Sequence, residues 1–191
     1  MQSYYNKKFV GIEKDNIAIS DIEFVECVFE GCKFADCDFV DCAFLECKFI
    51  NCSIVNMKAI SVELKYVEFE KCTLVGIQWH KFVCGAIAFP ISKLNNCFLK
   101  YNNFEEMNFR KFDFKCSAIL SSTFLRCNLM ESIFKNCDLK DTAFSDCNLQ
   151  KSDFRGANGF NINLLENKVK GAKFSCLEAI NLLYPFGIII D

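Results

Sequence analysis

Residues 27–52 read CVFEGCKFADCDFVDCAFLECKFINC, a stretch in which cysteine stands at every fifth position six times. A phenylalanine lies two places after each of the first five cysteines, and Ile54 follows the sixth. Five residues advance an α-helix by about 140°, so the cysteines would scatter around a helix. On a flat strand, Cys27 and Cys32 would point to opposite faces. All of these side chains point one way only if the backbone turns once in every five residues.

This period predicts a β-solenoid, in which each five-residue block makes one short extended side and one corner. We call the phenylalanine position the centre of a block. From residue 24 to residue 154 the frame gives 27 centres without a slip, of which fifteen are Phe, seven are Leu and none is polar or charged. Upstream apolar residues fit from about residue 16. We expect residues 77–103 to be the least regular, because Trp79 and Cys84 are centres there and Pro90 follows.

The position two before each centre is occupied mainly by small side chains. Serine or threonine fills it six times, and cysteine fills it eleven times, at Cys27, Cys32, Cys37, Cys42, Cys47, Cys52, Cys72, Cys97, Cys127, Cys137 and Cys147. We therefore interpret the cysteines as small apolar core residues. Zinc sites use convergent CxxC pairs, often with histidine, and this chain has no CxxC and one histidine. We expect no metal site, no cofactor and no structural disulfide.

Composition narrows the classes of function. The 191 residues carry a net charge of −2, so no basic excess points to a nucleic-acid partner. No apolar run approaches the roughly 18 residues of a membrane helix, and the N-terminus lacks the apolar stretch of a signal peptide. We expect a cytoplasmic protein with reduced thiols. His80 is expected to be exposed at a corner, and no P-loop or GxGxxG is present, so we expect no enzyme activity.

Residues 137–158, CDLKDTAFSDCNLQKSDFRGAN, resemble the repeat of the pentapeptide-repeat proteins. That resemblance implies an all-β fold, a right-handed quadrilateral β-helix with four blocks per coil and a short C-terminal helix. We expect residues 1–157 to form the solenoid and residues 158–191 to form a C-terminal capping and dimerisation segment. Loops often interrupt the frame in the quinolone-resistance members of this family, and the sequence shows no such interruption.

The tail carries a second resemblance. Ser175 and Glu178 fit a capping box, which predicts a helix of about ten residues that runs through Tyr184 and ends at Pro185, followed by a short β segment. The tail is similar to the C-terminal dimerisation module of the quinolone-resistance, mycobacterial fluoroquinolone-resistance and microcin-immunity proteins. These are rod-shaped dimers that act on DNA gyrase and topoisomerase IV. The resemblance implies a homodimer interface formed by Leu177, Ile180, Leu183, Ile188 and Ile190.

If four blocks make a coil, residues twenty apart share one face. The face through centres 24, 44 and 64 and on to centre 144 carries seven acidic residues against Lys65 and Arg126, a surplus of five negative charges. The other three faces sum to +1, +2 and 0. The acidic face either mimics DNA phosphates or is only a solvated surface. We take it as the candidate partner-binding face, formed by Glu23, Glu26, Glu46, Glu63, Glu105, Glu106 and Asp146.

Two functions remain open. The first is a DNA-mimicking protein that binds type II topoisomerases and protects them from, or modulates, quinolones or gyrase-directed toxins. The second is a non-catalytic scaffold that binds another protein, since fold alone does not fix function. Under the first, the partner is DNA gyrase or topoisomerase IV, without direct contact to nucleic acid or membrane.

Overall fold

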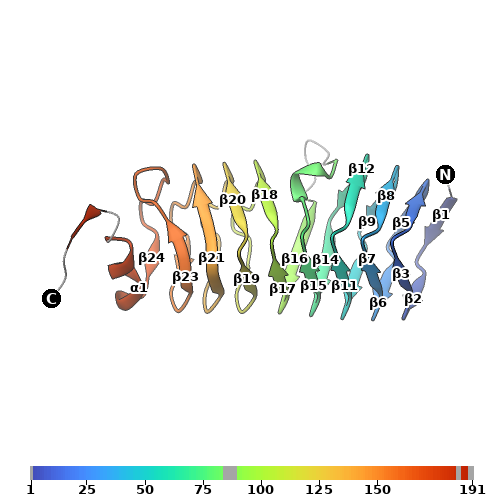
Figure 1. Ribbon diagram of the computed structural model, residues 1–191, viewed down its shortest axis with the longest axis horizontal. Helices are drawn as coiled ribbons and strands as arrows, with labels where there is room; N and C mark the ends of the chain where they lie inside the picture. Colours follow the sequence, from blue (N-terminus) through green and yellow to red (C-terminus); the bar gives the residue numbers. More distant parts are fainter. Residues whose placement is uncertain (1, 84–89, 184–185, 189–191) are drawn as a thin grey trace. The chain divides into compact units, whose positions relative to one another are not determined.

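The computed structural model describes residues 2–83, 90–183 and 186–188. It divides into two compact units, Met1–Asn103 (the first unit) and Phe104–Asp191 (the second unit). Each unit is built from short parallel strands that stack coil upon coil (Figure 1). The fold is therefore the all-β solenoid predicted from the five-residue period, with one short C-terminal helix.

Each coil is made of three-residue strands joined by corners. One coil contains β6 (Val28–Glu30), β7 (Lys33–Ala35), β8 (Asp38–Val40) and β9 (Ala43–Leu45). The corner residue two after each centre has a left-handed backbone, as at Asp36 (φ 50°) and Asp41 (φ 50°). Aspartate, asparagine and glycine tolerate this conformation best, which explains their frequency at corners. One left-handed residue per block turns the chain without a long loop.

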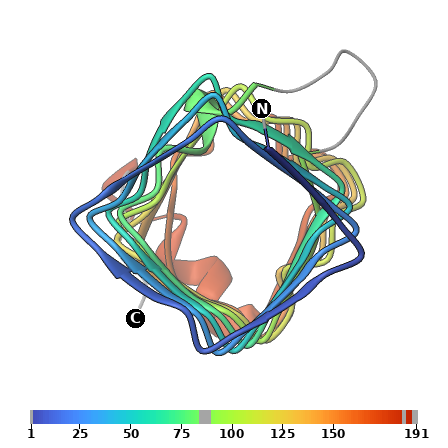
Figure 2. The same ribbon diagram turned by 90° about the vertical axis from the view of Figure 1, so that its right-hand side faces the viewer.

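The first unit has four sheets, one for each side of its coils (Figure 2). Two sheets consist of β1 (Gln2–Tyr5), β5 (Ile22–Val25), β9 and β13 (Glu63–Lys65), and of β2 (Lys8–Val10), β6, β10 (Lys48–Ile50), β14 (Val67–Glu70) and β16 (Ile91–Asn95). The others consist of β3 (Glu13–Asp15), β7, β11 (Ser53–Val55), β15 (Thr73–Val75) and β17 (Phe98–Lys100), and of β4 (Ala18–Ser20), β8 and β12 (Lys58–Ile60). Stacking begins at Gln2, fourteen residues before the start expected from the sequence.

The second unit continues the same construction. Its strands are β19 (Ala118–Leu120), β20 (Thr123–Leu125), β21 (Asp138–Ser145), β22 (Asp153–Phe154), β23 (Asn158–Ile162) and β24 (Lys173–Phe174), and β18 (Asn103–Glu105) spans the boundary. Single bridges stack Asn108, Asn128, Asn148 and Lys168 in turn. Because β22 pairs with β24, stacked coils extend beyond Ala157, where the sequence had suggested that the repeat ends.

Phenylalanine rings form ladders inside both units. Phe29 stacks on Phe49 with ring centroids 4.7 Å apart, and Phe124 stacks on Phe104 at 4.6 Å. All eleven cysteines of the small-residue position are buried beside these ladders, as predicted. Among the thirteen cysteines that the structure describes, only Cys116 and Cys176 are exposed. The core is thus filled by the same two positions of every block.

The stretch 77–103 is the least regular part of the first unit, as expected. In the preceding coils of the first unit stacked residues are twenty positions apart, as Phe49 and Phe69 are. Phe69, however, pairs with Leu94, which is twenty-five positions further along the chain. A bulge also puts Ile91 into the core position beside Val67, where the frame had placed Ser92. The coil is therefore longer by five residues. The uninterrupted frame read from the sequence hid this insertion, because a whole extra block keeps the period.

A 3₁₀ helix, Trp79–Lys81, begins this longer coil. Trp79 is buried and its indole Nε1–H donates a hydrogen bond to Oδ1 of Asn102, 3.0 Å away. Asn102 occupies the position two before a centre, where it is the one amide side chain in the frame, and it accepts the hydrogen bond of the only tryptophan in the sequence. His80, expected to be exposed, is half-buried in this helix.

The C-terminal helix α1 (Cys176–Asn181) is shorter than predicted. Ser175 is its N-cap residue, but no capping-box bond forms, because the Ser175 hydroxyl accepts a hydrogen bond from the backbone N–H of Gly156 at 2.8 Å. The N–H of Leu182 bonds to the carbonyl of Ala179, three residues back, which tightens and ends the helix. Residues 186–188 form no strand, and residues 184–185 and 189–191 lie outside the described part of the chain. No helix in the described part has the length and apolar character needed to cross a membrane.

Candidate interaction surfaces

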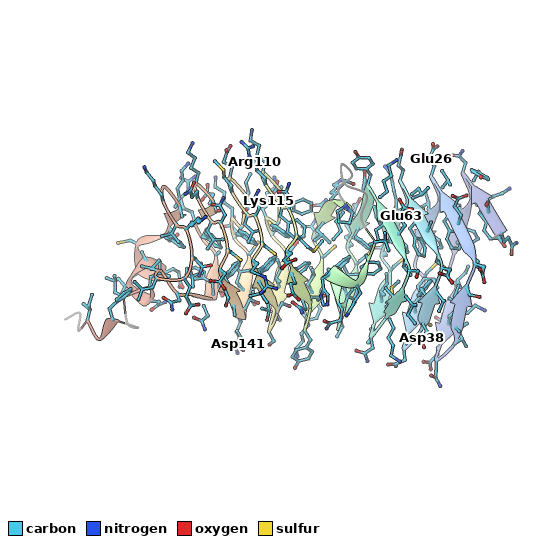
Figure 3. The ribbon with its side chains drawn as sticks, turned by 90° about the horizontal axis from the view of Figure 1, so that it is seen from above. Glu26, Asp38, Glu63, Arg110, Lys115 and Asp141 are labelled. Atoms are coloured by element: carbon cyan, nitrogen blue, oxygen red, sulfur yellow. The ribbon has the colours of Figure 1, made fainter. Side chains whose placement is uncertain are left out.

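Four of the seven predicted acidic residues share one side of the first unit. We call Glu23, Glu26, Glu46 and Glu63 the acidic column. Strand pairing stacks Phe24 on Phe44 and Phe44 on Leu64. Glu26 and Glu46 therefore occupy the same corner of successive coils, whereas Glu23 and Glu63 stand two coils apart with Ala43 between them. Glu26 and Glu46 are exposed, and Glu23 and Glu63 are partly exposed. Figure 3 shows Glu26 and Glu63 on this unit.

The acidic column is not neutralised by ion pairs within the described residues. Tyr5 donates a hydrogen bond to Glu23 at 3.3 Å, and Lys65 is the one basic residue at the outward positions of this sheet. By contrast, several carboxylates on other sides of the unit are paired, as Glu68 is with Lys48 at 3.4 Å and Asp38 with Lys58 at 3.4 Å. The column therefore retains its negative potential.

The remaining three residues were assigned to this face by counting in steps of twenty, and that count fails. Val83 pairs with Glu63, so the count would put Asn103 next to Val83. Asn103 pairs with Gln78 instead, because of the five-residue insertion. Glu105, Glu106 and Asp146 thus lose the basis on which they were placed beside Glu63, and are described with the second unit.

In the second unit, Glu105 and Glu106 face a single base. The Arg126 guanidinium donates hydrogen bonds to Glu106, at 2.9 Å, and to Glu105. The hydrogen bond that Arg126 donates to Glu106 raises the pKa of Arg126, as expected for a cation held by carboxylates. Asp146 is exposed at a corner of the same side. Arg126 thus neutralises part of the negative charge of Glu105, Glu106 and Asp146.

The second unit has a basic surface that the sequence analysis missed. Its two adjacent sides, centred on Phe109, Leu129, Leu149 and Val169 and on Phe114, Phe134, Phe154 and Phe174, carry nine basic residues against Asp113, Glu131 and Asp153. We call this the basic face; its bases are Arg110, Lys111, Lys115, Lys135, Lys151, Arg155, Lys168, Lys170 and Lys173. Figure 3 shows Arg110 and Lys115 on the opposite side of the second unit from Asp141.

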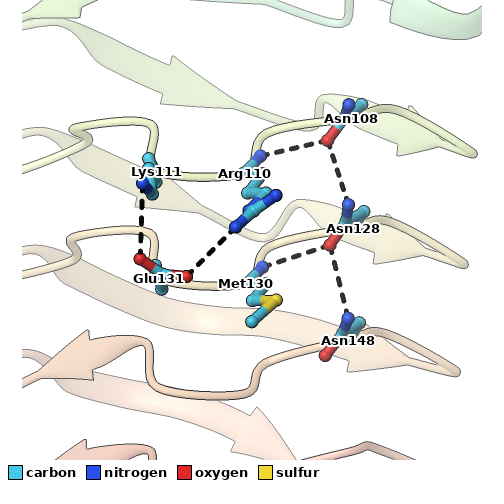
Figure 4. Close-up of polar contacts among 7 residues, drawn as sticks. All are labelled: Asn108, Arg110, Lys111, Asn128, Met130, Glu131 and Asn148. Carbon is cyan, nitrogen blue, oxygen red and sulfur yellow. Dashed lines mark hydrogen bonds and ion pairs between the residues drawn. The ribbon is translucent and has the colours of Figure 1, made fainter.

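Some charges of the basic face are paired. Glu131 lies 3.5 Å from Arg110 and 3.8 Å from Lys111 (Figure 4). Asp153 accepts two hydrogen bonds from Arg155, at 2.9 and 2.6 Å, and lies 3.5 Å from Lys135. The Arg155 guanidinium is the main cause that lowers the pKa of Asp153 to about 2. Asp153 is therefore ionised at neutral pH and fixes Arg155 in place.

An asparagine ladder holds the backbone beside these charges (Figure 4). The amide of Asn128 donates to Oδ1 of Asn108 at 3.1 Å, and that of Asn148 donates to Asn128 at 3.4 Å. Each Oδ1 also accepts a backbone N–H two residues ahead, at Arg110 and Met130. The corners that carry the basic residues are thus cross-linked from coil to coil.

The repeat pattern decides the family. The profile described as pentapeptide repeat region matches residues 22–101, and that described as pentapeptide repeats (8 copies) matches residues 118–159. The chain belongs to the pentapeptide-repeat family. No curated protein sequence matches this pentapeptide-repeat chain.

Among solved structures, one match supports the fold. Full-length QnrB1, a plasmid-mediated fluoroquinolone resistance protein, superposes with a TM-score of 0.60 and 16% identity over 97% of this chain and 100% of its own. HetL, involved in heterocyst differentiation regulation in the cyanobacterium Nostoc sp. strain PCC 7120, gives a TM-score of 0.39 and 12% identity over 89% of this chain and 86% of its own. At 16% identity the likeness to QnrB1 concerns the fold alone.

One cavity inside the described part of the first unit is too small for a substrate. In the first unit, an apolar cavity of about 20 Å³ is lined by aromatic and aliphatic side chains that include Phe39, Leu64 and Trp79. This volume is close to that of one water-sized probe, and the lining has no polar group to orient a ligand. The described residues contain no group of three or more His, Cys, Asp or Glu side chains that could hold a metal ion.

The core thiols of this pentapeptide-repeat chain are held as donors. Cys47 donates to the carbonyl of Phe24 at 3.3 Å, and Cys137 to that of Phe114 at 3.0 Å, in each case 23 residues back. Burial raises the pKa of both thiols to about 12. At Cys47 and Cys137 the thiolate, which is the reactive form, is therefore scarce at neutral pH.

We expect two fast-reacting thiols among the thirteen described cysteines, Cys116 and Cys176, because both are exposed. Mass spectrometry after brief alkylation of the native, reduced protein would identify them. The double variant Cys116→Ser and Cys176→Ser should lose the fast phase of alkylation. Any fast alkylation that remains should be at Cys84, which lies outside the described residues. Fast labelling of Cys47 or Cys137 would contradict the burial.

Proposed function

We propose that this pentapeptide-repeat protein binds a type II topoisomerase, DNA gyrase or topoisomerase IV, by presenting its acidic column in place of DNA phosphates. The observation that carries the proposal is the group of carboxylates on one side of the first unit, Glu23, Glu26, Glu46 and Glu63, which form no ion pair with the residues that the structure describes. The likeness of the whole fold to QnrB1, a fluoroquinolone resistance protein, supports it. The role is one of binding, without catalysis or a cofactor.

The spacing of the column suits this role. Stacked coils repeat at about 4.8 Å, so the carboxylates form two short parallel rows, Glu23 with Glu63 and Glu26 with Glu46, on one side of the solenoid. A groove that holds duplex DNA presents lysine and arginine side chains, and complementary charge accelerates and orients association with such a groove. The acidic column carries fewer charges per unit length than duplex DNA, which carries about one charge per 1.7 Å of axis. The affinity of the protein for the enzyme should therefore fall less steeply with salt than that of DNA.

A supercoiling assay with purified gyrase, with and without a fluoroquinolone, tests the proposal. We expect the purified protein to reduce either supercoiling or drug-stabilised DNA cleavage in a concentration-dependent way. The same assay with topoisomerase IV tests the second enzyme. If the protein changes neither reaction of either enzyme, the topoisomerase proposal is wrong, and the alternative, a scaffold that binds another protein, takes its place.

We further propose that the protein acts as a homodimer through its C-terminal tail. Of the five residues assigned to this interface, Leu177 on α1 is 79% exposed and Ile188 is 46% exposed. Ile180 and Leu183 are partly buried, and Ile190 lies outside the described residues. An isologous contact between two copies would cover these apolar side chains.

The variant Leu177→Asp is expected to convert a dimer into a monomer, because it puts a charge into the centre of the apolar contact. Light scattering at micromolar concentration measures this. Leu165→Asp is the matched control, since Leu165 is 80% exposed in the same unit but lies outside α1. A wild-type protein that is monomeric at that concentration would contradict the proposal.

A further inference from the structure

We propose that the basic face of the second unit binds the phosphate backbone of double-stranded DNA. The topoisomerase proposal does not require this contact, since it concerns a different unit and a charge of the opposite sign. The inference departs from the sequence analysis, which expected no contact with nucleic acid because the net charge of the whole chain is −2.

Charge is strongly segregated within the second unit. The basic face carries nine basic residues against three acidic ones, a surplus of six positive charges. The two remaining sides carry Arg126 and Lys140 against Glu105, Glu106, Asp138, Asp141, Asp146 and Glu166, a surplus of four negative charges. A surface that only kept the protein soluble would need no such separation.

Four lysines of the basic face have no ion-pair partner among the described residues. Lys151 and Lys170 lie on neighbouring coils, since the N–H of Lys151 bonds to the carbonyl of Lys170 at 3.1 Å. Lys168 stacks on Asn148, and Lys173 stacks on Asp153. All four lysines are exposed. We call Lys151, Lys168, Lys170 and Lys173 the free lysines.

The framework that carries these charges is rigid and periodic. The asparagine ladder ties the corners of successive coils, and the coil repeat is about 4.8 Å. Duplex DNA presents a phosphate charge about every 1.7 Å of its axis, so each lysine finds a phosphate within reach of its flexible stem. Lysine acts here as a point charge, which suits contact with a backbone rather than with base edges.

The chemistry of the face favours duplex over single-stranded DNA. Proteins that bind single strands stack the bases on aromatic side chains. At the described outward positions of these two sides, no aromatic residue is present; the apolar ones are Met130 and Ile133. The face can therefore contact phosphates but offers no platform for bases, and binding should be independent of sequence.

The acidic parts of the second unit do not cancel this attraction. The corner at Asp141 is diagonally opposite the corner at Lys111 within the coils of this unit. Each side of a coil has three strand residues, about 10 Å of extended chain. The two corners are thus separated by more than the Debye length, about 10 Å at 0.1 M salt, so their charges act on a ligand largely independently.

Fluorescence anisotropy with a labelled duplex of about 20 base pairs and random sequence tests the proposal. We expect micromolar affinity at about 50 mM salt, and a slope of log K against log salt of roughly −3 to −4, the value for about four neutralised phosphates. The variant in which all four free lysines are changed to Gln should bind at least tenfold more weakly. The corresponding Lys→Arg variant should bind like wild type.

Matched controls separate this inference from general charge effects. Changing Lys8, Lys33, Lys48 and Lys58 to Gln removes the same charge from the first unit, where each lysine is paired with a carboxylate. This control should retain DNA binding, as should the variant in which Glu23, Glu46 and Glu63 are changed to Lys. Thermal unfolding would establish that all variants are folded.

Three results would overturn the inference. The first is no binding to the duplex at 50 mM salt, and the second is an equal loss in the first-unit lysine control. The third is tighter binding to a single strand than to a duplex. Salt-sensitive self-association that is abolished by the Lys→Gln variant, without DNA binding, would instead assign the basic face to an acidic surface of a second copy. Failure on gyrase with retained DNA binding would reject the topoisomerase proposal alone.

Discussion

Phe124→Ala is expected to lower the free energy of unfolding by about 3–5 kcal/mol. Phe124 is fully buried, and its ring stacks between those of Phe104 and Phe144, with centroids 4.6 and 4.9 Å away. It also meets the edges of Phe114 and Phe134. The strands on either side are hydrogen-bonded in register, so the backbone cannot collapse into the space that the ring leaves. The loss therefore includes both the transfer of the ring and the cavity.

Urea or thermal unfolding followed by circular dichroism measures this change. Leu165→Ala is the control, because Leu165 is also apolar and lies in the same unit but is 80% exposed. It should change the free energy of unfolding by less than about 0.5 kcal/mol. A similarly small effect of Phe124→Ala would mean that the ring ladder does not stabilise the solenoid.

Reversing the acidic column is expected to weaken the effect on gyrase at least tenfold. The variant changes Glu23, Glu46 and Glu63 together to Lys, which puts positive charge where the proposed partner presents its own lysines and arginines. The three side chains lie at outward positions, so the core is untouched and the fold should be retained. The protein concentration that halves supercoiling, or quinolone-stabilised cleavage, is the measured quantity.

The matched control reverses Asp21, Asp38 and Asp41 to Lys. These three residues belong to the sheet of β4, β8 and β12 and its corners, so the variant adds the same charge to a different side of the first unit. It should act on gyrase like wild type. If both variants lose activity equally, only net charge matters and the acidic column is not the binding surface.

The five-residue period was sufficient to predict the fold and the core. A centre that is never polar, with a small residue two places before it, admits only a chain that turns once per block, and the burial of Phe29, Phe124 and the eleven cysteines confirms this. The start at Gln2 was missed because the first coils contain weaker centres, among them Lys14. The length of helix α1 was overestimated from its capping signals. The local sequence does not show that the backbone N–H of Gly156 donates a hydrogen bond to the Ser175 hydroxyl.

The lateral arrangement of the blocks was not predictable from the period. An insertion of one whole block leaves every centre in frame, yet it puts a residue that follows it, such as Asn103, on the side of the coil before the one that the count gives. Only the pairing of Phe69 with Leu94 and of Gln78 with Asn103 reveals it. The basic face was missed for a related reason, since sums over the whole chain gave +1 and +2. Sums taken over residues 104–175 alone would have indicated it.

The buried thiols report on the opening of the coils that carry them. A repeat protein of this kind has contacts mainly between adjacent coils, so its stability is a sum of local terms and parts of it can open separately. A core cysteine such as Cys47 or Cys137 becomes reactive only when the thiol leaves its carbonyl partner on the preceding coil. The alkylation rate of each cysteine thus measures the free energy of that local opening. The natural sequence carries such a probe in both units, so fraying can be followed residue by residue without introducing a label.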